Sequence, residues 1–499
     1  MNFVSQTASV SAMIHGNTAQ STRNNRRVQV TRNLTWSNRA QTVKCTPEQS
    51  FFPKHFEDLK AVVKMADRTE KNIRVVASGY AQSDLISTPD ILLYLQHLDR
   101  VRVDQSQVDC PIVVAEAGAT IGKINHAIES EGFALPSNVV MEDAQIGAVI
   151  SSGSQGTGWS QGCMSDLVEW IELIDSTGTL RRFDRQSDSP EVMQAVSLHM
   201  GMMGITYRLA LRIQPTWNVH VIDQRLPLED TIAHLPVLVK SHESVQFWWK
   251  PFSEEIWMRS WNRTDRAVTS TDRHCVMMRT SARIRSQAQM MLAKAGNRMP
   301  KWSRKFSQWQ FNCTMESSDR VVSILNAIHC RRACHCLQAG SIQFAFPLSE
   351  DFHEAQQAFE MVKTNIEAFS EQFGLPAHLN LHARFVGGSQ ATLSPTHGME
   401  HACYLYLSGD HSDARWAELT AQIASEWLKI SGATIHWASS FQHIPGIVPI
   451  LREKLSKQID AFLDIKEDLN LDPQGRFMSQ HLASIFDQNI GPVGTSISR

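Results

Sequence analysis

The segment that most constrains this chain runs from Gln145 to Gly158, where four glycines stand among serine, threonine and small apolar residues. Because glycine has no Cβ, backbone N–H groups in such a segment can converge on an anion, and the hydroxyls supply further donors. The composition therefore favours a loop that holds a pyrophosphate. The GxGxxG spacing, the following helix and the acidic residue about 20 positions later that mark a Rossmann dinucleotide site do not assemble here. A glycine-rich turn without a ligand is the alternative interpretation.

A second loop of small residues, Ala77 to Asp84, follows the short apolar segment Ile73–Val76. A long dinucleotide needs anchoring at more than one point, so this loop strengthens the ligand-binding interpretation of the first. Apolar residues between Phe56 and Ala66 recur at helical spacing immediately before this strand. The predicted order is therefore a helix, a strand and a loop of small residues.

The rest of the N-terminal half alternates short apolar strands with helices. Further predicted elements are strands at Ile91–Leu95, Ile112–Ala115, Leu167–Ile174 and Leu180–Phe183 and an amphipathic helix at Ile121–Ser130. We therefore expect an α+β or α/β fold without internal repeats.

The composition is typical of a globular protein. The 499 residues are 42% hydrophobic and 20% charged, and 48 Lys and Arg against 50 Asp and Glu give a formal net charge of -2. At roughly 100 to 200 residues per domain, this length predicts two or three domains. A protein whose main partner is nucleic acid usually has an excess of Lys and Arg, and this chain has none. No apolar run approaches the ~18 residues that span a bilayer, so we expect a soluble protein without a transmembrane segment.

The first residues are basic and contain no Asp or Glu before Glu48. An organelle-targeting leader has this composition, and a solvated tail is the alternative. We expect residues 1–35 to form a disordered extension of a cytoplasmic protein, unless the extension directs the protein to an organelle. The nine cysteines are scattered through a long chain, which favours reduced thiols over a disulfide framework.

Several short motifs occur in an order that resembles one flavoprotein family. They are Trp36 with Cys45–Glu48, Val75–Asp84, Gly147–Gly158, Gly201–Ile205, Ala383–Phe385 with Leu393–Pro395, His436–Ala438 and Leu471–Phe477. In these motifs the chain resembles the vanillyl-alcohol oxidase type of FAD proteins. Within that type it is similar to the sugar-lactone oxidases, which include gulonolactone oxidase, galactonolactone dehydrogenase and alditol oxidase. The likeness runs from about Trp36 to Phe486 and is weakest between Thr264 and Gln338.

The resemblance implies an α+β protein with a bipartite, PCMH-type FAD-binding domain and a cap domain that has an antiparallel sheet. By similarity, residues 36–217 would bind FAD, 218–440 would form the cap, and 441–499 would return to the FAD domain. Two loops and a short motif would bind the cofactor, the motif near the adenine end. The residues concerned are Ala77, Ser78, Gly79, Tyr80, Ala81, Gln82 and Ser83; Gly147, Ser152, Gly153, Gln155, Gly156, Thr157 and Gly158; and Gly204 and Ile205.

Tyr80 departs from the family pattern. Lactone oxidases commonly carry the flavin covalently on a histidine at this position, and tyrosine cannot form that histidyl bond. The resemblance, with this departure, implies non-covalent FAD. A covalent link through another residue has no supporting motif.

Two further departures fall on the expected active site. Where the family has Glu-x-Arg, this chain has His382-Ala383-Arg384, and alternate residues of a strand share a face. An imidazole suits proton acceptance near neutral pH, and an arginine stabilises an alkoxide or an anionic flavin. We expect His382 as the base, Arg384 as the electrostatic clamp and His436 as part of the pocket wall. The alternative for His382 is a hydrogen-bonded strand histidine without a catalytic role, and the alternative for Arg384 is a structural ion pair.

The third departure is Ser439, which stands where the family has a lysine, so one cationic contact is missing. Together the departures argue against an ordinary aldonolactone as substrate.

Other patterns carry less weight. His329–Cys336 could bind zinc but lacks a second ligand pair, so we expect no metal. The tryptophans between Phe247 and Trp261, with Trp302 and Trp309, favour sheet packing over substrate stacking, and the basic residues between Arg279 and Lys305 favour a solvated face.

The sequence thus predicts an FAD-dependent oxidoreductase that oxidises a CH–OH group of a sugar-like, lactone or polyol substrate by hydride transfer to flavin N5. The electron acceptor would be dioxygen or a quinone or cytochrome, and no nucleic acid is expected as a partner. Two alternatives stay open: a flavin-dependent tailoring enzyme (a desaturase, cyclase or isomerase) and a non-catalytic flavin-binding protein.

Overall fold

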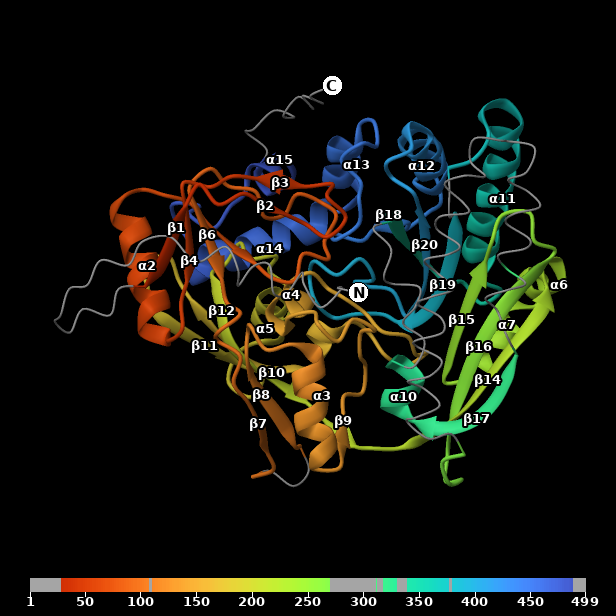
Figure 1. The fold of residues 1–499 in the computed structure, drawn as a ribbon, viewed down its shortest axis with the longest axis horizontal. Coiled ribbons are helices and arrows are strands. Elements are labelled where there is room, and N and C mark those ends of the chain that lie inside the picture. Colours follow the sequence, from red (N-terminus) through yellow and green to blue (C-terminus); the bar gives the residue numbers. More distant parts are fainter. Residues whose placement is uncertain are drawn as a thin grey trace, which may run out of the picture.

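The computed structural model describes residues 28–106, 110–269, 311, 317–329, 339–376 and 379–487. These form three main sheets (Figure 1). The first sheet has the order β1-β4-β6-β5, in which β4, β5 and β6 are parallel and β1 pairs antiparallel with β4. Its strands are β1 (Gln29–Arg32), β4 (Gln49–Phe52), β5 (Ile73–Val76) and β6 (Ile91–Tyr94).

Helix α2 (Phe56–Arg68) covers this sheet with Leu59, Val62, Val63 and Ala66, all buried, so the helical spacing read from the sequence is confirmed. The expected extension 1–35 was too long, because Gln29–Arg32 form β1. That strand lies at the sheet edge with most of its side chains exposed, and it is therefore held by backbone hydrogen bonds and carries no apolar signal.

The second sheet is antiparallel, with the order β11-β10-β12-β8-β7. Its strands are β7 (Val101–Asp104), β8 (Ile112–Glu116), β10 (Val168–Ile174), β11 (Leu180–Asp184) and β12 (Ile205–Arg212). Helices α3 (Ile121–Ser130), α4 (Ile146–Ser151) and α5 (Pro190–Ser197) and the 3-10 turn η1 (Met164–Leu167) share its hydrophobic core. The predicted helix at Ile121–Ser130 is confirmed, with Thr120 as its N-cap.

The third sheet has eight antiparallel strands in the order β17-β14-β16-β15-β19-β20-β18-β21. They are β14 (Asn218–Pro227), β15 (Ser244–Trp249), β16 (Glu255–Thr264), β17 (Ser318–Ser323), β18 (Gly340–Pro347), β19 (Asn380–Gly387), β20 (His401–Gly409) and β21 (Thr434–Ile435). Helices α6 (Leu228–Ala233), α7 (Leu235–Lys240), α11 (His353–Phe373) and α12 (Ala414–Trp427) pack on one face of the sheet (Figure 1).

Strand alternation decides what each face of this sheet carries. On β19, Leu381, Ala383 and Phe385 are fully buried in the core beneath the helices, whereas His382 and Arg384 point the other way. The second face therefore turns polar side chains toward the N-terminal half of the molecule.

The C-terminal segment returns to the N-terminal half as α13 (Ile447–Lys454), α14 (Ser456–Leu469) and α15 (Gln480–Phe486), drawn in blue in Figure 1. The Ile73 N–H donates to the Arg476 carbonyl at 2.8 Å, and the Ser176 N–H donates to the Leu471 carbonyl at 2.9 Å. We propose domain boundaries at 217/218 and 440/441, which would separate the FAD-binding domain, the cap domain and the returning C-terminal segment. Short elements complete the description: β2 (Trp36–Ser37), β3 (Lys44–Cys45), β9 (Phe133–Ala134), β13 (Gln214–Pro215) and α10 (Ile324–His329).

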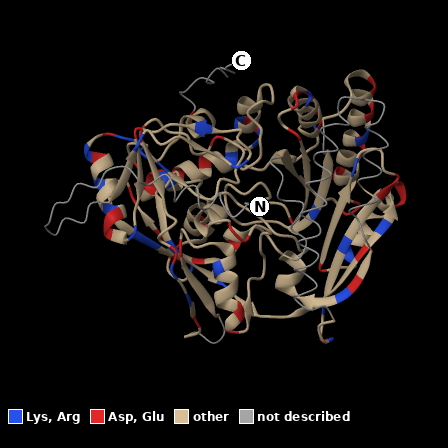
Figure 2. Cartoon of the chain, viewed as in Figure 1, with Lys and Arg blue, Asp and Glu red and all other residues tan. Residues whose placement is uncertain are grey.

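The α+β class with an antiparallel sheet is confirmed. Figure 2 shows acidic and basic residues interspersed over both halves, in agreement with the near-zero net charge. Within the described residues, no helix is long and apolar enough to cross a membrane.

Candidate functional site

The site is built where β19 meets the glycine-rich loop. His382 and Arg384 lie on the same face of this strand, and the Arg384 Nη1 donates to the Gln155 carbonyl at 3.2 Å. The Gly158 N–H donates to the Phe385 carbonyl at 3.2 Å, so the end of the loop also pairs with β19. Two regions that the sequence identified separately are thus one place in the fold.

His382 is held by two neighbours from β15. Its Nε2 lies 3.2 Å from the Gln246 Oε1, and its ring stacks on Trp248 with 4.3 Å between centroids and 10° between planes. Trp248 is the cross-strand partner of His382, and Gln246 is the partner of Arg384. The imidazole is therefore oriented from two sides.

Arg384 brings a positive charge that no described carboxylate pairs with. Burial lowers its pKa, and the neighbouring Tyr404 and Tyr406 on β20 oppose that shift. Tyr404 is its cross-strand partner, and burial raises the pKa of that phenol. An arginine in this setting stays cationic and is available to an anion.

His436 follows β21 and is neutral. Its N–H donates to the Gln343 carbonyl at 2.9 Å, and its Nδ1 accepts from the Ala438 N–H at 3.1 Å. Burial lowers the pKa of His436 to about 4, and the charge of Arg384 lowers it as well. Because Nδ1 accepts a hydrogen bond, the neutral ring carries its hydrogen on Nε2 and acts there as a donor.

Four buried nitrogen atoms around Arg384, and the hydroxyl of its cross-strand partner Tyr404, have no hydrogen-bond partner among the described residues. The nitrogen atoms are the Nε2 atoms of Gln155, Gln343 and His436 and the Nε of Arg384. Buried polar groups in folded proteins are nearly always satisfied, so a cluster of unsatisfied donors indicates a polar ligand that belongs there. All four atoms are N–H donors, which suits the carbonyl and ring-nitrogen acceptors of an isoalloxazine and the oxygens of a polyol.

The loop Ala77–Ser83 adjoins this cluster. The Gln82 N–H donates to the Ala438 carbonyl at 2.8 Å, the Gln82 Oε1 accepts from the Ser341 N–H at 2.7 Å, and the Ser83 hydroxyl donates to the Trp437 carbonyl. Gly79 has a φ of +72°, a conformation that favours glycine. Within the described residues, the N–H groups of Ser78, Gly79 and Ala81 donate to no protein acceptor, so they are free for an anion.

The second predicted loop turns sharply after Ser152, and the N–H groups of Ser152, Gly153, Ser154 and Gly158 donate to protein carbonyls. Gly153 has a φ of +67°, and a Cβ on Gly156 would lie 2.5 Å from the Asn138 carbonyl oxygen. The Ser152 hydroxyl is turned to the Ala148 carbonyl at 2.8 Å, and the Thr157 hydroxyl lies 3.0 Å from that of Ser244. Glycine is therefore required at these turns by conformation and by close approach.

The expected loop was too long at its start, because Ile146–Ser151 form helix α4. Gly147 lies inside this helix, its N–H donates to the Ala117 carbonyl at 3.0 Å, and a Cβ would lie 2.8 Å from that of Ala117. Gly147 therefore serves close packing, and its N–H is not available to a ligand. The small residues of the helix concealed it in the sequence.

Gly204 and Ile205 lie at the start of β12, where a Cβ on Gly204 would come 2.7 Å from the Ile174 carbonyl oxygen. The structure does not bring them to Arg384, and their place near the adenine stays a prediction. Ser439 is buried and donates to the His436 carbonyl at 2.9 Å, so it supports the turn.

The sequence did not point to four further residues of this site, Gln246, Gln343, Tyr404 and Tyr406. They belong to this site because β15, β19, β20 and β18 are neighbours in the sheet. Strand alternation predicts which residues within one strand share a face. It does not predict which strands lie next to β19, so these four residues could not be placed beside His382 from the sequence.

Most of the remaining candidate residues are not among those that the structure describes. The His329 Nε2 lies 3.0 Å from the Asn125 Nδ2. The rest of the proposed zinc cluster lies in 330–338, outside the described residues. The basic stretch, Trp302 and Trp309 lie in 270–310, which is also outside them. In the described part of the chain, no group of three His, Cys, Asp or Glu residues could hold a metal ion. Trp257 and Trp261 are buried in the sheet packing.

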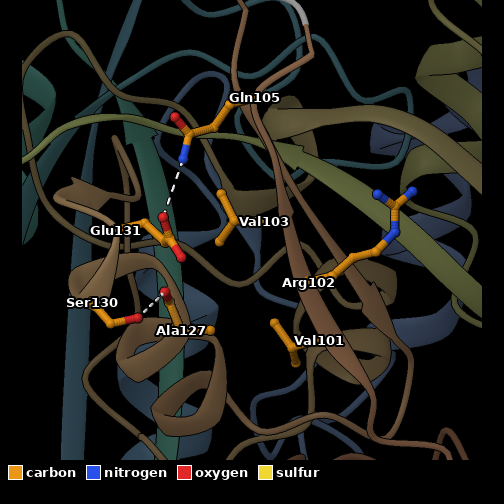
Figure 3. Close-up of a pocket in the computed structure, with 7 residues that line it drawn as sticks. All are labelled: Val101, Arg102, Val103, Gln105, Ala127, Ser130 and Glu131. Carbon is orange, nitrogen blue, oxygen red and sulfur yellow. Dashed lines mark hydrogen bonds between the residues drawn. The ribbon is translucent and has the colours of Figure 1, made fainter.

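A separate hollow of about 430 Å³ lies between β7 and α3 (Figure 3). It is lined by Val101, Arg102, Val103, Gln105, Ala127, Ser130 and Glu131. Gln105 and Glu131 are hydrogen bonded to each other at 3.3 Å, so their polar groups are already partnered. It lies on the second sheet, apart from the cluster around Arg384.

Comparisons with known proteins show which families and which fold the chain is similar to. Residues 47–184 match a family described as FAD binding domain, and residues 209–485 match one described as D-arabinono-1,4-lactone oxidase. L-gulonolactone oxidase of Scyliorhinus torazame is 23% identical over 464 residues, which are 90% of this chain and 98% of that protein. The Mus musculus L-gulonolactone oxidase is 25% identical over 460 residues, with the same two coverages.

Among solved structures, cholesterol oxidase from B. sterolicum superimposes with a TM-score of 0.80 at 15% identity, over 94% of this chain and all of that chain. At this identity the likeness concerns the fold alone. It confirms the PCMH-type FAD fold that the sequence motifs implied.

Proposed function

The chain belongs to the D-arabinono-1,4-lactone oxidase family, whose profile covers residues 209–485, and we propose on that premise that it is an FAD-dependent oxidoreductase acting on a CH–OH group of a sugar-like lactone or polyol. The observation that carries the proposal is the cluster of unpartnered buried donors around Arg384, beside a loop with free backbone N–H groups. FAD offers acceptors for both sets.

FAD is proposed to bind without a covalent bond. The N–H groups of Ser78, Gly79 and Ala81 and the loop Ser152–Gly158 would hold the pyrophosphate. Tyr80 stands where a flavin-linked histidine would be required, so acid-denatured protein should release all of its flavin into the supernatant. Flavin that stays on the denatured chain would contradict this part of the proposal.

The residues of the site divide the work of alcohol oxidation. When bound, FAD accepts the hydride that leaves the substrate carbon. His382 is proposed to take the hydroxyl proton, and the contacts of its ring with Gln246 and Trp248 support this role. Arg384 stabilises the negative charge that develops on the oxygen, and the Nε2–H of His436 donates a hydrogen bond in the same pocket.

The substrate is proposed to be polyhydroxylated. The face around His382 presents amides and phenols from Gln246, Gln343, Tyr404 and Tyr406, which suit several hydroxyl groups. Because His382 and Ser439 replace the family's glutamate and lysine, we propose a substrate other than an ordinary aldonolactone. Anaerobic addition of a panel of lactones, polyols and glycosides should bleach the flavin band near ~450 nm for at least one compound class.

A flavin-dependent tailoring enzyme on the same fold is the second candidate, favoured by those same two replacements. If flavin is bound and no compound of the panel bleaches it, a tailoring enzyme or a non-catalytic flavin-binding protein would be favoured over alcohol oxidation.

The relatives are named oxidases, so we propose dioxygen as the first electron acceptor to test, with a quinone or cytochrome next. Oxygen uptake separates these acceptors. A cytoplasmic location, or an organelle reached through the basic N-terminal residues, also belongs to the proposal.

A further inference from the structure

Tyr80 is gripped by two side chains from different parts of the chain. Its hydroxyl donates to the Asp143 Oδ1, and the guanidinium carbon of Arg39 lies 4.3 Å from the centroid of its ring. Arg39 comes from the turn after β2, and Asp143 comes from the segment before α4. The tip of the loop Ala77–Ser83 is therefore closed from both sides.

The two gripping residues also bind each other and the loop backbone. The Arg39 Nη2 lies 2.5 Å from the Asp143 Oδ2, and the Arg39 Nε donates to the Ser78 carbonyl at 2.7 Å. The Arg39 N–H donates to the Gly79 carbonyl at 2.9 Å, and the Ser78 hydroxyl donates to the Asp143 carbonyl. We call Arg39, Ser78, Tyr80 and Asp143 the Tyr80 clasp.

The clasp and its neighbour Asn38 bind the carbonyl side of the loop. The carbonyls of Ser78 and Gly79 are bound by Arg39, and the carbonyl of Ala81 accepts from the Asn38 Nδ2 at 2.9 Å. The N–H groups of these same three residues have no protein acceptor in the described chain. With the carbonyls bound on one side, the loop keeps a set of N–H groups for an anion, as in other backbone anion sites.

Fold stability alone does not account for the clasp. The side chains of Arg39 and Asp143 are 51% and 55% exposed, and an ion pair with such exposure contributes only about 0 to 1 kcal/mol. What the clasp orders is a loop with a left-handed glycine and free donors.

We propose that the Tyr80 clasp holds the loop Ala77–Ser83 in its FAD-binding conformation and so retains a cofactor that no covalent bond secures. The inference rests on the proposed function, and it assigns Arg39, Tyr80 and Asp143 as positioning residues.

The test is the dissociation constant of FAD from apoprotein, measured by quenching of flavin fluorescence. Tyr80→Phe removes the hydroxyl and keeps the ring under Arg39, and Asp143→Asn removes the charge and keeps the shape. The Tyr80–Asp143 bond is as exposed as the ion pair, so each variant should raise the dissociation constant about three- to fivefold, which corresponds to at most about 1 kcal/mol. Asp143→Asn weakens the bond that Tyr80→Phe removes and also the ion pair to Arg39, so the effects of the two substitutions should be less than additive in the double variant.

Tyr94→Phe is the matched control, because Tyr94 lies on β6 and stacks on Phe52 at 4.6 Å, outside the clasp. It should bind FAD as the parent does, and the melting temperature of apo Tyr80→Phe should equal that of the parent. Dissociation constants within twofold of the parent for Tyr80→Phe and Asp143→Asn would overturn the clasp, as would fully additive effects. A parent protein that binds no FAD would overturn the proposed function and the clasp together, so the two failures are distinguishable.

Discussion

Arg74 gives the strongest prediction about what holds the FAD half of the molecule together. This buried side chain of β5 is 4% exposed and donates to backbone carbonyls from three segments. The acceptors are Leu85 at 2.6 Å, Met200 at 2.8 Å, Gly201 at 3.1 Å and Phe477. Arg74 thus joins β5, the loop before β12 and the returning C-terminal segment.

Replacing Arg74 with methionine keeps an unbranched side chain of comparable length but leaves four carbonyls without this donor. At about 1 kcal/mol for each unsatisfied group, the loss would be about 4 kcal/mol. Removing a buried charge returns part of this, since burial lowers the pKa of Arg74 to about 10. We therefore expect Arg74→Met to lower the free energy of unfolding by about 2 to 4 kcal/mol.

The assay is urea unfolding followed by tryptophan fluorescence, with Arg68→Met as the control. Arg68 is exposed in the last turn of α2, and within the described residues it donates only to the Lys64 carbonyl, at 3.1 Å. Its loss should therefore change stability by less than about 0.5 kcal/mol. An Arg74→Met protein within 1 kcal/mol of the parent would refute the reasoning that these bonds secure the C-terminal segment.

Three further predictions concern the site. Arg384→Met should slow flavin reduction by about 10² to 10³ in rapid-mixing experiments, since it removes the charge that faces the developing alkoxide, and an unchanged rate would exclude that role. Gly156→Ala should weaken FAD binding in a fluorescence titration, because its Cβ would lie 2.5 Å from the Asn138 carbonyl oxygen, and unchanged affinity would show that the loop adapts freely. Burial lowers the pKa of His436 to about 4 and of His199 to about 3, so below pH ~6.5 the unfolded chain binds protons that the folded chain does not. Stability should therefore fall as the pH drops from ~6.5 to 4, by about 1.4 kcal/mol per pH unit for each histidine, and urea midpoints for His436→Gln should show a smaller slope than the parent.

Local pattern predicted much of the N-terminal half. The helices α2 and α3 and the strands β5, β6 and β8 were read from apolar spacing, because each buries one face in a continuous core. Edge strand β1 and helix α4 were missed, since exposed side chains in β1 and small residues in α4 give no periodic signal.

The candidate site was predicted where it lies in contiguous motifs and missed where it depends on strand order. His382 and Arg384 were identified by the resemblance to the family's Glu-x-Arg motif, and their two-residue spacing predicted that they share one face of a strand. Gln246 and Gln343 join them from strands more than 30 residues away in sequence, through pairings that no local pattern encodes. The Tyr80 clasp has the same origin, because Arg39 and Asp143 are 104 residues apart.

The most direct test of the account is the rate at which substrate reduces the flavin in the FAD-loaded parent and in His382→Ala, mixed anaerobically with a compound that bleaches the parent. The two proteins should bind FAD with equal affinity, and the variant should be reduced more slowly by a factor on the order of 10² to 10⁴, because a general base contributes that much. A variant reduced as fast as the parent would contradict the assignment of the polar face around His382 and Arg384 as the place where the substrate is oxidised.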